Sequence, residues 1–362
     1  MFLGFGEIMA RIAPPGQLRW RQALPGAVNV TWGGGEANVC ASLALLGQRA
    51  RFLTALPRTP VTEALVGTLR GLGVDTEPIL WRKEGRLGLY FVEGGANQRG
   101  STVLYDRSHS AISLAGPEEY DFGSALAGVK WLHVTGITPA ISEAAQRANL
   151  AIVQQAKATG ASVSCDLNFR KKLWNWRPGT APKALARECM AAVLPYVDLV
   201  IANEEDAADV LDIHAEGTDV TAGRINSAAY TRVAQRIVER FPNVSRVAIT
   251  LRESHSADHN DWGALLYDAP SRQAHFAPLD PHGEYRPYEI RDIVDRVGGG
   301  DSFAAGLLYA LASPDFAAGD KAIAFAVAAS CLKHSIQGDF NYVSRDEIVA
   351  LMSGNASGRV QR

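Results

Sequence analysis

Short apolar runs alternate with longer amphipathic stretches along most of this 362-residue chain. The apolar runs have the length of buried strands and lie at residues 2–6, 49–57, 129–136, 161–168, 197–203 and 246–251. Stretches with helical spacing lie between them, at residues 36–47, 61–73, 142–160 and 229–241. Regular succession of strand and helix is typical of an α/β fold, a mainly parallel sheet with helices on both faces. Binding sites in such sheets lie at the carboxyl ends of the strands.

Two segments interrupt this alternation. Residues 10–32 separate the first strand from the first helix, and residues 86–107 have the pattern of a hairpin with a glycine-rich connection. We expect these segments, the second extended to about residue 113, to form a small β-sheet that stands off the main one. The whole chain, residues 1–362, is otherwise expected to be a single α/β domain.

Composition excludes several classes of partner. The net charge is −2 with no block of like charge, so neither a nucleic acid nor an anionic membrane surface is indicated. No apolar run reaches the roughly 18 residues of a membrane span, and the first residues do not resemble a secretion signal. The four cysteines form no CxxC pair, which favours thiols in a reducing compartment over disulfides or a zinc site. We therefore expect a cytoplasmic protein.

The segment DRVGGGDSF, residues 295–303, places three glycines before a carboxylate at the start of a helical pattern. Glycine permits backbone angles that a Cβ would forbid, and amides at a helix N-terminus attract anions. The simple alternative is a turn at Gly298–Gly300 with Asp301 or Ser302 as the helix cap. This segment alone does not decide between an anion site and an ordinary cap.

A second glycine-rich segment, WGGGEANVCASLALLG at residues 32–47, nearly matches a dinucleotide-binding fingerprint. Asn38 stands where the third glycine would be, and no acidic residue closes the second strand, so a Rossmann cofactor site is not indicated. The glycines would instead let a polar ligand approach the backbone, and Asn38 offers both a donor and an acceptor. No P-loop motif occurs in the chain.

Polar side chains follow two of the predicted strands. Asp166, Asn168 and Arg170 alternate at one strand end, so they share a face, and Arg170 could grip a carboxylate or a phosphate. After the next strand, Asn203 precedes a carboxylate cluster that includes Asp206 and could hold a Mg²⁺-water shell. The alternatives are a solvated strand end and ordinary helix-start carboxylates.

The two remaining candidates lie on predicted surface segments. Tyr90, Tyr105 and Arg107 could close over a polyol from the small sheet, or form a solvated hairpin with aromatic cross-strand pairs. His255 and His259 lie among acids in residues 252–261, which we expect to be a loop. No third ligand has a recognisable spacing there, so we do not predict a specific metal site.

Together these segments resemble the PfkB (ribokinase-like) family of sugar kinases over nearly the whole chain. Two motifs are the basis of this resemblance, GGGEANVCASLALLG and DRVGGGDSFAAG, and the second is similar to the family's D-T-x-G-A-G-D-x-F. Arg296 and Gly299 replace the usual threonine and alanine, but the glycine amides and the terminal aspartate are kept. Four further segments are similar to the 2-keto-3-deoxygluconate kinases of this family: GEIMARIAPPG, YDRSHSA, DLNFRKKLW and KHSIQGDFN.

This resemblance implies a three-layer sandwich with a β-lid, and ATP-dependent phosphorylation of a sugar acid, 2-keto-3-deoxygluconate, to its 6-phosphate. It implies Asp301 as the base, with the amides of Gly298, Gly299 and Gly300 as the anion hole. The predicted substrate contacts are Gly34, Asn38, Tyr90, Tyr105, Arg107, Arg170, Asp301 and Asp339. The predicted nucleotide contacts are Asn168, Arg170, Asn203, Thr250, Arg252, Gly298, Gly300 and Val327, with ATP and Mg²⁺ as cofactors.

Two departures from the family pattern affect the nucleotide side. The family's N-x-x-E becomes Asn203 to Asp206, a shorter acid that would reach Mg²⁺ through water. The segment TLRESHSADHNDW replaces a glycine-rich loop, where Arg252 could supply charge instead. The resemblance also allows a monovalent cation, and exposed lid edges predict a homodimer formed through the lid.

Two alternatives stay open for the function. Fold does not choose the sugar, so a fructokinase or another hexose kinase is the alternative within the family. The alternative from another class is a catalytically silent sugar-binding regulator, against which the intact Asp301 and its glycines argue.

Overall fold

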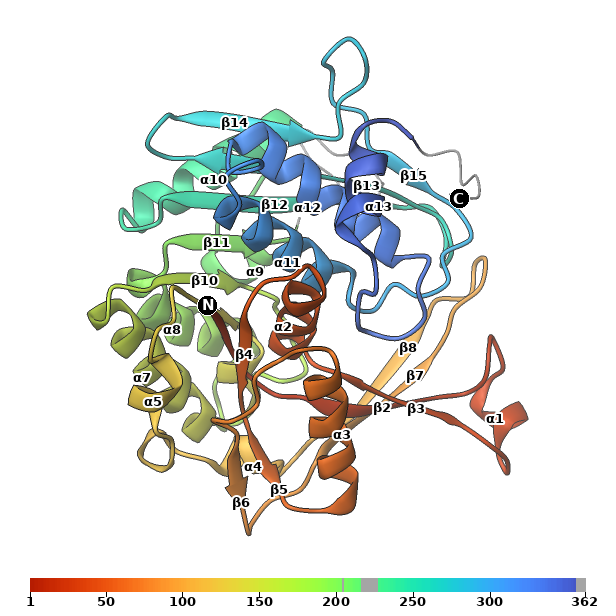
Figure 1. Cartoon of the computed structure of the whole chain (residues 1–362), viewed down its shortest axis with the longest axis vertical. Helices are drawn as coiled ribbons and strands as arrows, with labels where there is room; N and C mark the ends of the chain where they lie inside the picture. The colour runs from red at the N-terminus through yellow and green to blue at the C-terminus, as the bar shows by residue number, and fades with distance from the viewer. Residues whose placement is uncertain (204, 216–226, 356–362) are drawn as a thin grey trace.

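A mainly parallel sheet forms the centre of the computed structural model, which describes residues 1–203, 205–215 and 227–355 (Figure 1). Its strand order is β14-β13-β12-β11-β10-β9-β1-β4, and β15 pairs with β13. The strands are β1 (Phe2–Phe5), β4 (Ala50–Leu53), β9 (Trp131–Thr135), β10 (Ser162–Asp166), β11 (Leu199–Ala202), β12 (Arg246–Ser254), β13 (Asn260–Asp268), β14 (Gln273–Ala277) and β15 (Tyr288–Ile290). The strands from β12 to β4 pair in parallel, while β13 is antiparallel to its neighbours. The predicted sheet is therefore confirmed.

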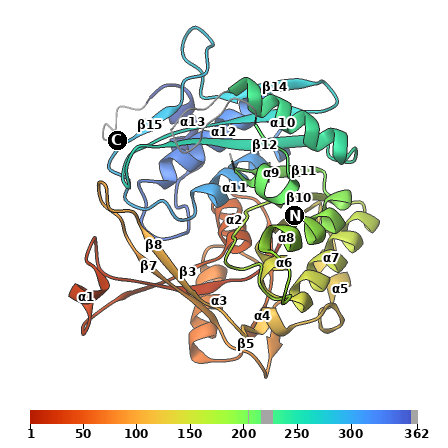
Figure 2. The same ribbon diagram turned by 180° about the vertical axis from the view of Figure 1, so that it is seen from behind.

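Helices cover both faces of this sheet (Figures 1 and 2). One layer contains α7 (Glu143–Ala158), α8 (Pro182–Val193), α9 (Asp206–Leu211) and α10 (Ser227–Arg240). The other contains α2 (Gly35–Leu45), α3 (Pro60–Gly71), α11 (Gly299–Ala312), α12 (Gly319–Lys333) and α13 (Arg345–Met352). Shorter helices are α1 (Trp20–Ala23), α4 (Ala111–Leu114), α5 (Phe122–Leu126) and α6 (Thr138–Ile141). None of the helices in the described ranges has the length and apolar character needed to cross a membrane.

The strands separate two apolar cores because their successive side chains point to opposite faces. In β11, Leu199 and Ile201 pack with the layer that contains α11 and α12, whereas Val200 and Ala202 pack with the layer that contains α7 and α8. A strand buried on both faces needs a continuous apolar sequence, which explains why these strands are visible as apolar runs.

The two segments that interrupt the alternation form a separate four-stranded sheet with the order β3-β2-β7-β8. Its strands are β2 (Met9–Ala13), β3 (Asn29–Gly33), β7 (Gly88–Glu93) and β8 (Thr102–Asp106). The sheet stands off to one side of the molecule, with α1 beyond its far end (Figures 1 and 2). The predicted hairpin is present, since β7 and β8 pair antiparallel with Tyr90 opposite Tyr105.

Two local predictions were wrong. The expected strand 49–57 is two strands, because the carbonyl of Thr54 accepts a bond from the Leu80 amide (2.9 Å) and the chain leaves the main sheet there. Its second part, β5 (Ala55–Pro57), pairs with β6 (Leu80–Arg82) in a small sheet of its own. The expected loop 252–261 contains the ends of two strands, since antiparallel pairing of β12 with β13 continues to Ser254 and Asn260.

Candidate active site

A cavity of about 380 Å³ lies between the small sheet and the carboxyl ends of the central strands. It brings together nearly every predicted site residue: Gly34, Asn38, Tyr90, Tyr105, Arg107, Asn168, Arg170, Asn203, Asp206, Thr250, Arg252, Gly298, Gly299, Gly300, Asp301 and Asp339. Val327 is the exception. Its side chain is 0% exposed in α12 and packs in the core, so it does not line this cavity.

The glycine-rich segment opens α11 at the cavity wall. Gly298 precedes the helix with φ of 84°, in the left-handed region that favours glycine, and a Cβ there would lie 2.2 Å from the carbonyl oxygen of Asp339. The first amides of a helix have no intrahelical acceptor, and the helix dipole places partial positive charge at the same end. The start of α11 can therefore receive an anion.

Asp301 lies in the first turn of α11, beside those amides. Asn38 donates from Nδ2 to Oδ2 of Asp301 over 2.6 Å, while its own Oδ1 accepts a bond from the Gly34 amide over 3.2 Å. Burial raises the pKa of Asp301 to about 6, against the lowering effect of the Asn38 bond and with a further rise from Asp339. A carboxylate with this pKa is ionised at neutral pH and accepts a proton more readily than an ordinary aspartate.

Buried ion pairs connect the small sheet to the glycine-rich segment Gly298–Gly300. Arg11 on β2 contacts Asp339 over 2.9 Å and Asp295 over 2.6 Å, and all three side chains are at most 6% exposed. Asp295 also accepts bonds from the amides of Val297 and Gly338, each over 3.0 Å. Arg11 thus holds in place both the loop before Gly298 and the loop that presents Asp339.

A second buried pair lies on the same side of the cavity. Arg107 donates from Nε to Oε2 of Glu7 over 2.7 Å, and its Nη2 contacts the same oxygen. The Arg107 guanidinium also lies 5.6 Å from the ring centre of Tyr105. Oε1 of Glu7 is buried without a hydrogen-bond partner among the described residues, although Glu7 lines the cavity. That oxygen can accept a bond from a ligand hydroxyl.

Acidic groups occupy the strand ends opposite the small sheet. Each oxygen of Asp206 accepts a backbone amide, from Phe169 over 2.9 Å and from Asn203 over 3.0 Å, so this side chain joins the loops after β10 and β11. Burial and the charge of Asp206 raise the pKa of Asp166 well above its usual value. Arg170 is exposed, and within the described residues its side chain donates a hydrogen bond only to the neighbouring carbonyl of Phe169, over 3.4 Å.

The β12-β13 hairpin forms the remaining wall. Thr250, Arg252, Asn260 and Trp262 of these strands line the cavity. Arg296 donates from Nη2 to the carbonyl of Ala257 over 2.5 Å. This arginine therefore attaches the segment before Gly298 to the turn of the hairpin.

Sequence reasoning missed four charged residues of the cavity and its supports: Glu7, Arg11, Glu36 and Asp295. Glu36 is 1% exposed, and its Oε1 accepts bonds from the Thr135 amide and from the hydroxyls of Thr135 and Thr138. Burial raises the pKa of Glu36 to about 7. A usable signal was present, because Glu7 and Arg11 interrupt the apolar N-terminal segment FLGFGEIMARIA, where charge is costly unless it is paired.

Comparisons with known proteins agree with this geometry. Residues 5–240 match the family described as pfkB family carbohydrate kinase. A crystal structure of 2-dehydro-3-deoxygluconokinase from Thermotoga maritima is 43% identical, with a TM-score of 0.87 over 98% of this chain and 99% of that one. A PfkB family carbohydrate kinase from Listeria grayi is 30% identical, with a TM-score of 0.83 over 97% of this chain and 99% of that one.

Another relative is named for a different sugar acid. The 2-dehydro-3-deoxygalactonokinase of Haloferax volcanii is 27% identical over 354 residues, which is 98% of this chain and 97% of the relative. The likenesses span nearly the whole chain, and they confirm the predicted ribokinase-like fold class and the predicted family.

Proposed function

We propose one reaction for this chain, from the premise that it belongs to the pfkB family of carbohydrate kinases. Membership makes the protein a sugar phosphotransferase. The proposed reaction moves the γ-phosphoryl group of ATP to the 6-hydroxyl of 2-keto-3-deoxygluconate, the compound also named 2-dehydro-3-deoxygluconate. We further propose that residues 1–362 act as one α/β domain whose small sheet, within about 10–32 and 86–113, is a lid.

The observation that carries this proposal is the position of Asp301 beside the first amides of α11, at a cavity lined by both sheets. A kinase must take a proton from a hydroxyl and stabilise the negative charge that gathers on the phosphoryl oxygens. In our proposal Asp301 accepts the proton, and the amides of the Gly298–Gly300 segment stabilise the phosphoryl group. These two roles explain why a carboxylate would lie next to an anion site.

The strand-end carboxylates fit a hard divalent cation. Asp166 and Asp206 are both buried and both have raised pKa values, so a positive ion nearby would relieve their mutual repulsion. Mg²⁺ held there, with Asp206 acting through water, would neutralise charge on the phosphate oxygens. The nucleotide would lie along Asn168, Asn203, Thr250 and Arg252, residues that line this side of the cavity. A monovalent cation stays a prediction to which no residue is assigned.

The choice of a sugar acid rests on two arginines of the cavity, Arg107 and Arg170. A neutral hexose needs no guanidinium, whereas a carboxylate pairs with one bidentately. Arg107 is already paired with Glu7, so its charge is partly balanced. Arg170 forms no ion pair within the described part of the chain, and it is the arginine with the greater capacity for a new carboxylate or phosphate.

The lid also supports a proposal about assembly. Val30 on β3 is 55% exposed and Leu104 on β8 is 67% exposed, and these are the edge strands of the small sheet. Exposed edge strands with apolar side chains favour pairing with a second copy of the chain. We therefore propose a cytoplasmic homodimer formed through the lid. Sedimentation should show a dimer that Leu104→Glu dissociates, and a strictly monomeric wild type would contradict this assembly.

The test of the reaction is a substrate panel. The purified chain is assayed with ATP and Mg²⁺ on 2-keto-3-deoxygluconate, 2-keto-3-deoxygalactonate, fructose and ribose, and the phosphorylated position is read by NMR. We expect the highest kcat/KM on 2-keto-3-deoxygluconate, with the phosphate on C6. A preference for fructose would replace the proposal with a fructokinase. Binding of a sugar without turnover of any panel member would favour a silent regulator.

A further inference from the structure

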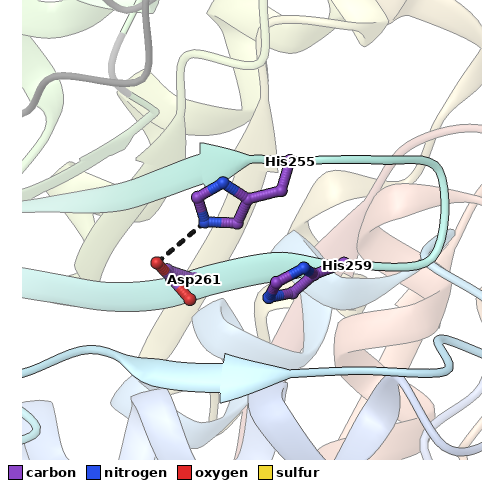
Figure 3. A group of neighbouring side chains, drawn as sticks. All are labelled: His255, His259 and Asp261. Carbon is purple, nitrogen blue, oxygen red and sulfur yellow. Dashed lines mark hydrogen bonds and ion pairs between the residues drawn. The ribbon is translucent and has the colours of Figure 1, made fainter. Parts of the chain in front are cut away.

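Three metal-ligating side chains converge at the turn of the β12-β13 hairpin (Figure 3). His255 and His259 lie on the turn, and Asp261 lies on β13. Successive residues of a strand point to opposite faces, and Asp261 immediately precedes Trp262, which lines the active-site cavity. Its cross-strand partner is Glu253, on the same outer face. The cluster is therefore separate from the proposed kinase site.

The three side chains are already close to the geometry of a metal site. One ligand atom from each residue lies within 4.8 Å of the others. Nε2 of His255 is 2.9 Å from Oδ2 of Asp261, and the two imidazole ring centres are 4.6 Å apart. Their side chains are 42%, 30% and 23% exposed in the order His255, His259 and Asp261, so an ion can reach them from solvent.

We propose that His255, His259 and Asp261 bind one divalent transition-metal ion of the Zn²⁺ class. Two imidazoles and one carboxylate are a ligand set that such ions prefer, whereas Mg²⁺ prefers oxygen ligands alone. Ligand bonds of about 2.0–2.2 Å around a tetrahedral ion place the donor atoms roughly 3.3–3.6 Å apart. Side-chain rotation alone can supply the remaining approach, because all three side chains are partly exposed.

Glu289 on β15 provides a fourth group next to these three. It is the direct cross-strand partner of Asp261, and its Oε1 lies 3.2 Å from Nε2 of His259. Arg291, the residue that follows β15, pairs with the same carboxylate. Glu289 can therefore complete a four-ligand site if it turns from Arg291, or leave the fourth position to water.

An ion at this place would act on more than the turn itself. The amide of Ala257 donates to the carbonyl of Asn97 in the β7-β8 connection over 2.7 Å, and Asp258 accepts a bond from the Asn97 amide over 3.0 Å. Arg296 holds the Ala257 carbonyl from the other side. The turn thus joins the tip of the small sheet to the segment before Gly298, and a bound ion would stiffen that junction.

The experiment is calorimetric titration of Zn²⁺ into the full chain after chelator treatment, with excess Mg²⁺ present to occupy oxygen-only sites. We expect one equivalent of Zn²⁺ to bind to wild type and to His282→Ala, a control that removes an exposed histidine elsewhere. His255→Ala, His259→Ala and Asp261→Asn should each weaken binding at least about tenfold, since losing even an outer partner of a ligand costs that much.

Hydrogen exchange supplies an independent readout of the same site. Zn²⁺ should slow exchange of the Ala257 amide in wild type and leave it unchanged in His255→Ala. The proposal is overturned if wild type binds no Zn²⁺ in the presence of Mg²⁺, or if the three cluster variants bind it as tightly as wild type. Neither result depends on kinase activity, so the metal site stands or falls separately from the proposed reaction.

Discussion

On the side of the cavity next to the small sheet, charged side chains are buried and paired, whereas Arg170 on the side of the strand ends is exposed. Glu7, Arg11 and Arg107 are at most 7% exposed, and each has an ionic partner. Arg170, across the cavity, is exposed, and in the part of the chain that the structure describes its side chain donates only to a neighbouring carbonyl. The first side has its geometry fixed before any ligand arrives.

This difference matches the two ligands that we propose. Distinguishing one sugar from another requires donors and acceptors held in place, because each misplaced group reduces the discrimination. Nucleotide phosphates are recognised largely by charge, and Arg170 and the strand-end carboxylates with their cation can supply it without a rigid frame. Asp301 lies between the two sides, where the phosphoryl group would pass from one ligand to the other.

The largest effect is expected at that meeting point. Asp301→Asn keeps the size of the side chain but cannot accept a proton, so kcat should fall roughly 10²–10⁴-fold. Nucleotide binding, measured by calorimetry, should persist because the strand-end side is unchanged. Asp315→Asn, which alters an exposed aspartate, is the matched control. Near-wild-type turnover of Asp301→Asn would contradict the assignment of Asp301 as the general base.

We call the side of the cavity next to the small sheet the sugar side, because we propose that the sugar binds there. Its rigidity can be tested by removing the charge of Arg11. Arg11→Met leaves Asp295 and Asp339 buried without their partner, and loss of one member of a buried pair costs about 3–5 kcal/mol in the free energy of unfolding. Arg147→Met removes an exposed pair with Glu118 and should cost at most about 1 kcal/mol. Urea unfolding measures both. Equal losses for the two variants would mean that the sugar side is not held by Arg11.

The sugar-acid preference is expected to depend on Arg107 and Arg170, the two arginines on opposite sides of the cavity. Loss of a charge-assisted contact costs about 1.5–3 kcal/mol, so Arg107→Ala or Arg170→Ala should lower kcat/KM on the sugar acid roughly ten- to a hundredfold. Activity on fructose should change much less in Arg107→Ala, whereas Arg170→Ala should lower it as well, because Arg170 also supplies charge for the nucleotide phosphates. Because Arg107→Ala also leaves Glu7 unpaired, its unfolding free energy is measured alongside. Equal losses on both substrates in Arg107→Ala would contradict recognition of a carboxylate by this arginine.

A smaller effect is expected in the pH profile. The pKa of Asp301 is raised to about 6, and only the ionised form accepts a proton, so kcat/KM should rise with pH through about 6 and level off above it. The Asn38 bond and the charge of Arg170 both lower that pKa. Asn38→Ala and Arg170→Ala should therefore each move the rise to higher pH, and a rise that stays in place in both would exclude Asp301 as the titrating group.

The fold and the positions of most site residues were predictable for one physical reason. Buried parallel strands require continuous apolar sequence, so the strands were visible, and the carboxyl ends of those strands then located Asn168 and Asn203. The glycine-rich segment was equally visible because only glycine fits the left-handed backbone at Gly298. These features depend on local sequence.

What the sequence did not disclose depends on contacts between distant segments. Arg11 meets Asp339 across 328 positions, and Glu36 meets Thr135 across 99, so neither pairing has a local spacing. The His255, His259 and Asp261 cluster was set aside because residues 252–261 were expected to be a loop, whereas strand pairing brings Asp261 back to the two imidazoles. Val327 was assigned by resemblance alone, and its burial in α12 could not be read from its neighbours in sequence.

The division of the cavity into a sugar side and a nucleotide side is tested most directly by hydrogen exchange with each ligand alone. Saturating 2-keto-3-deoxygluconate should slow exchange in β7 and β8, around Tyr90 and Tyr105, and leave the ends of β11 and β12 unchanged. A non-hydrolysable ATP analogue with Mg²⁺ should give the reverse pattern, with protection after Ala202 and Thr250. A lid whose exchange is unaffected by the sugar acid, or protected only by the nucleotide, would contradict the account.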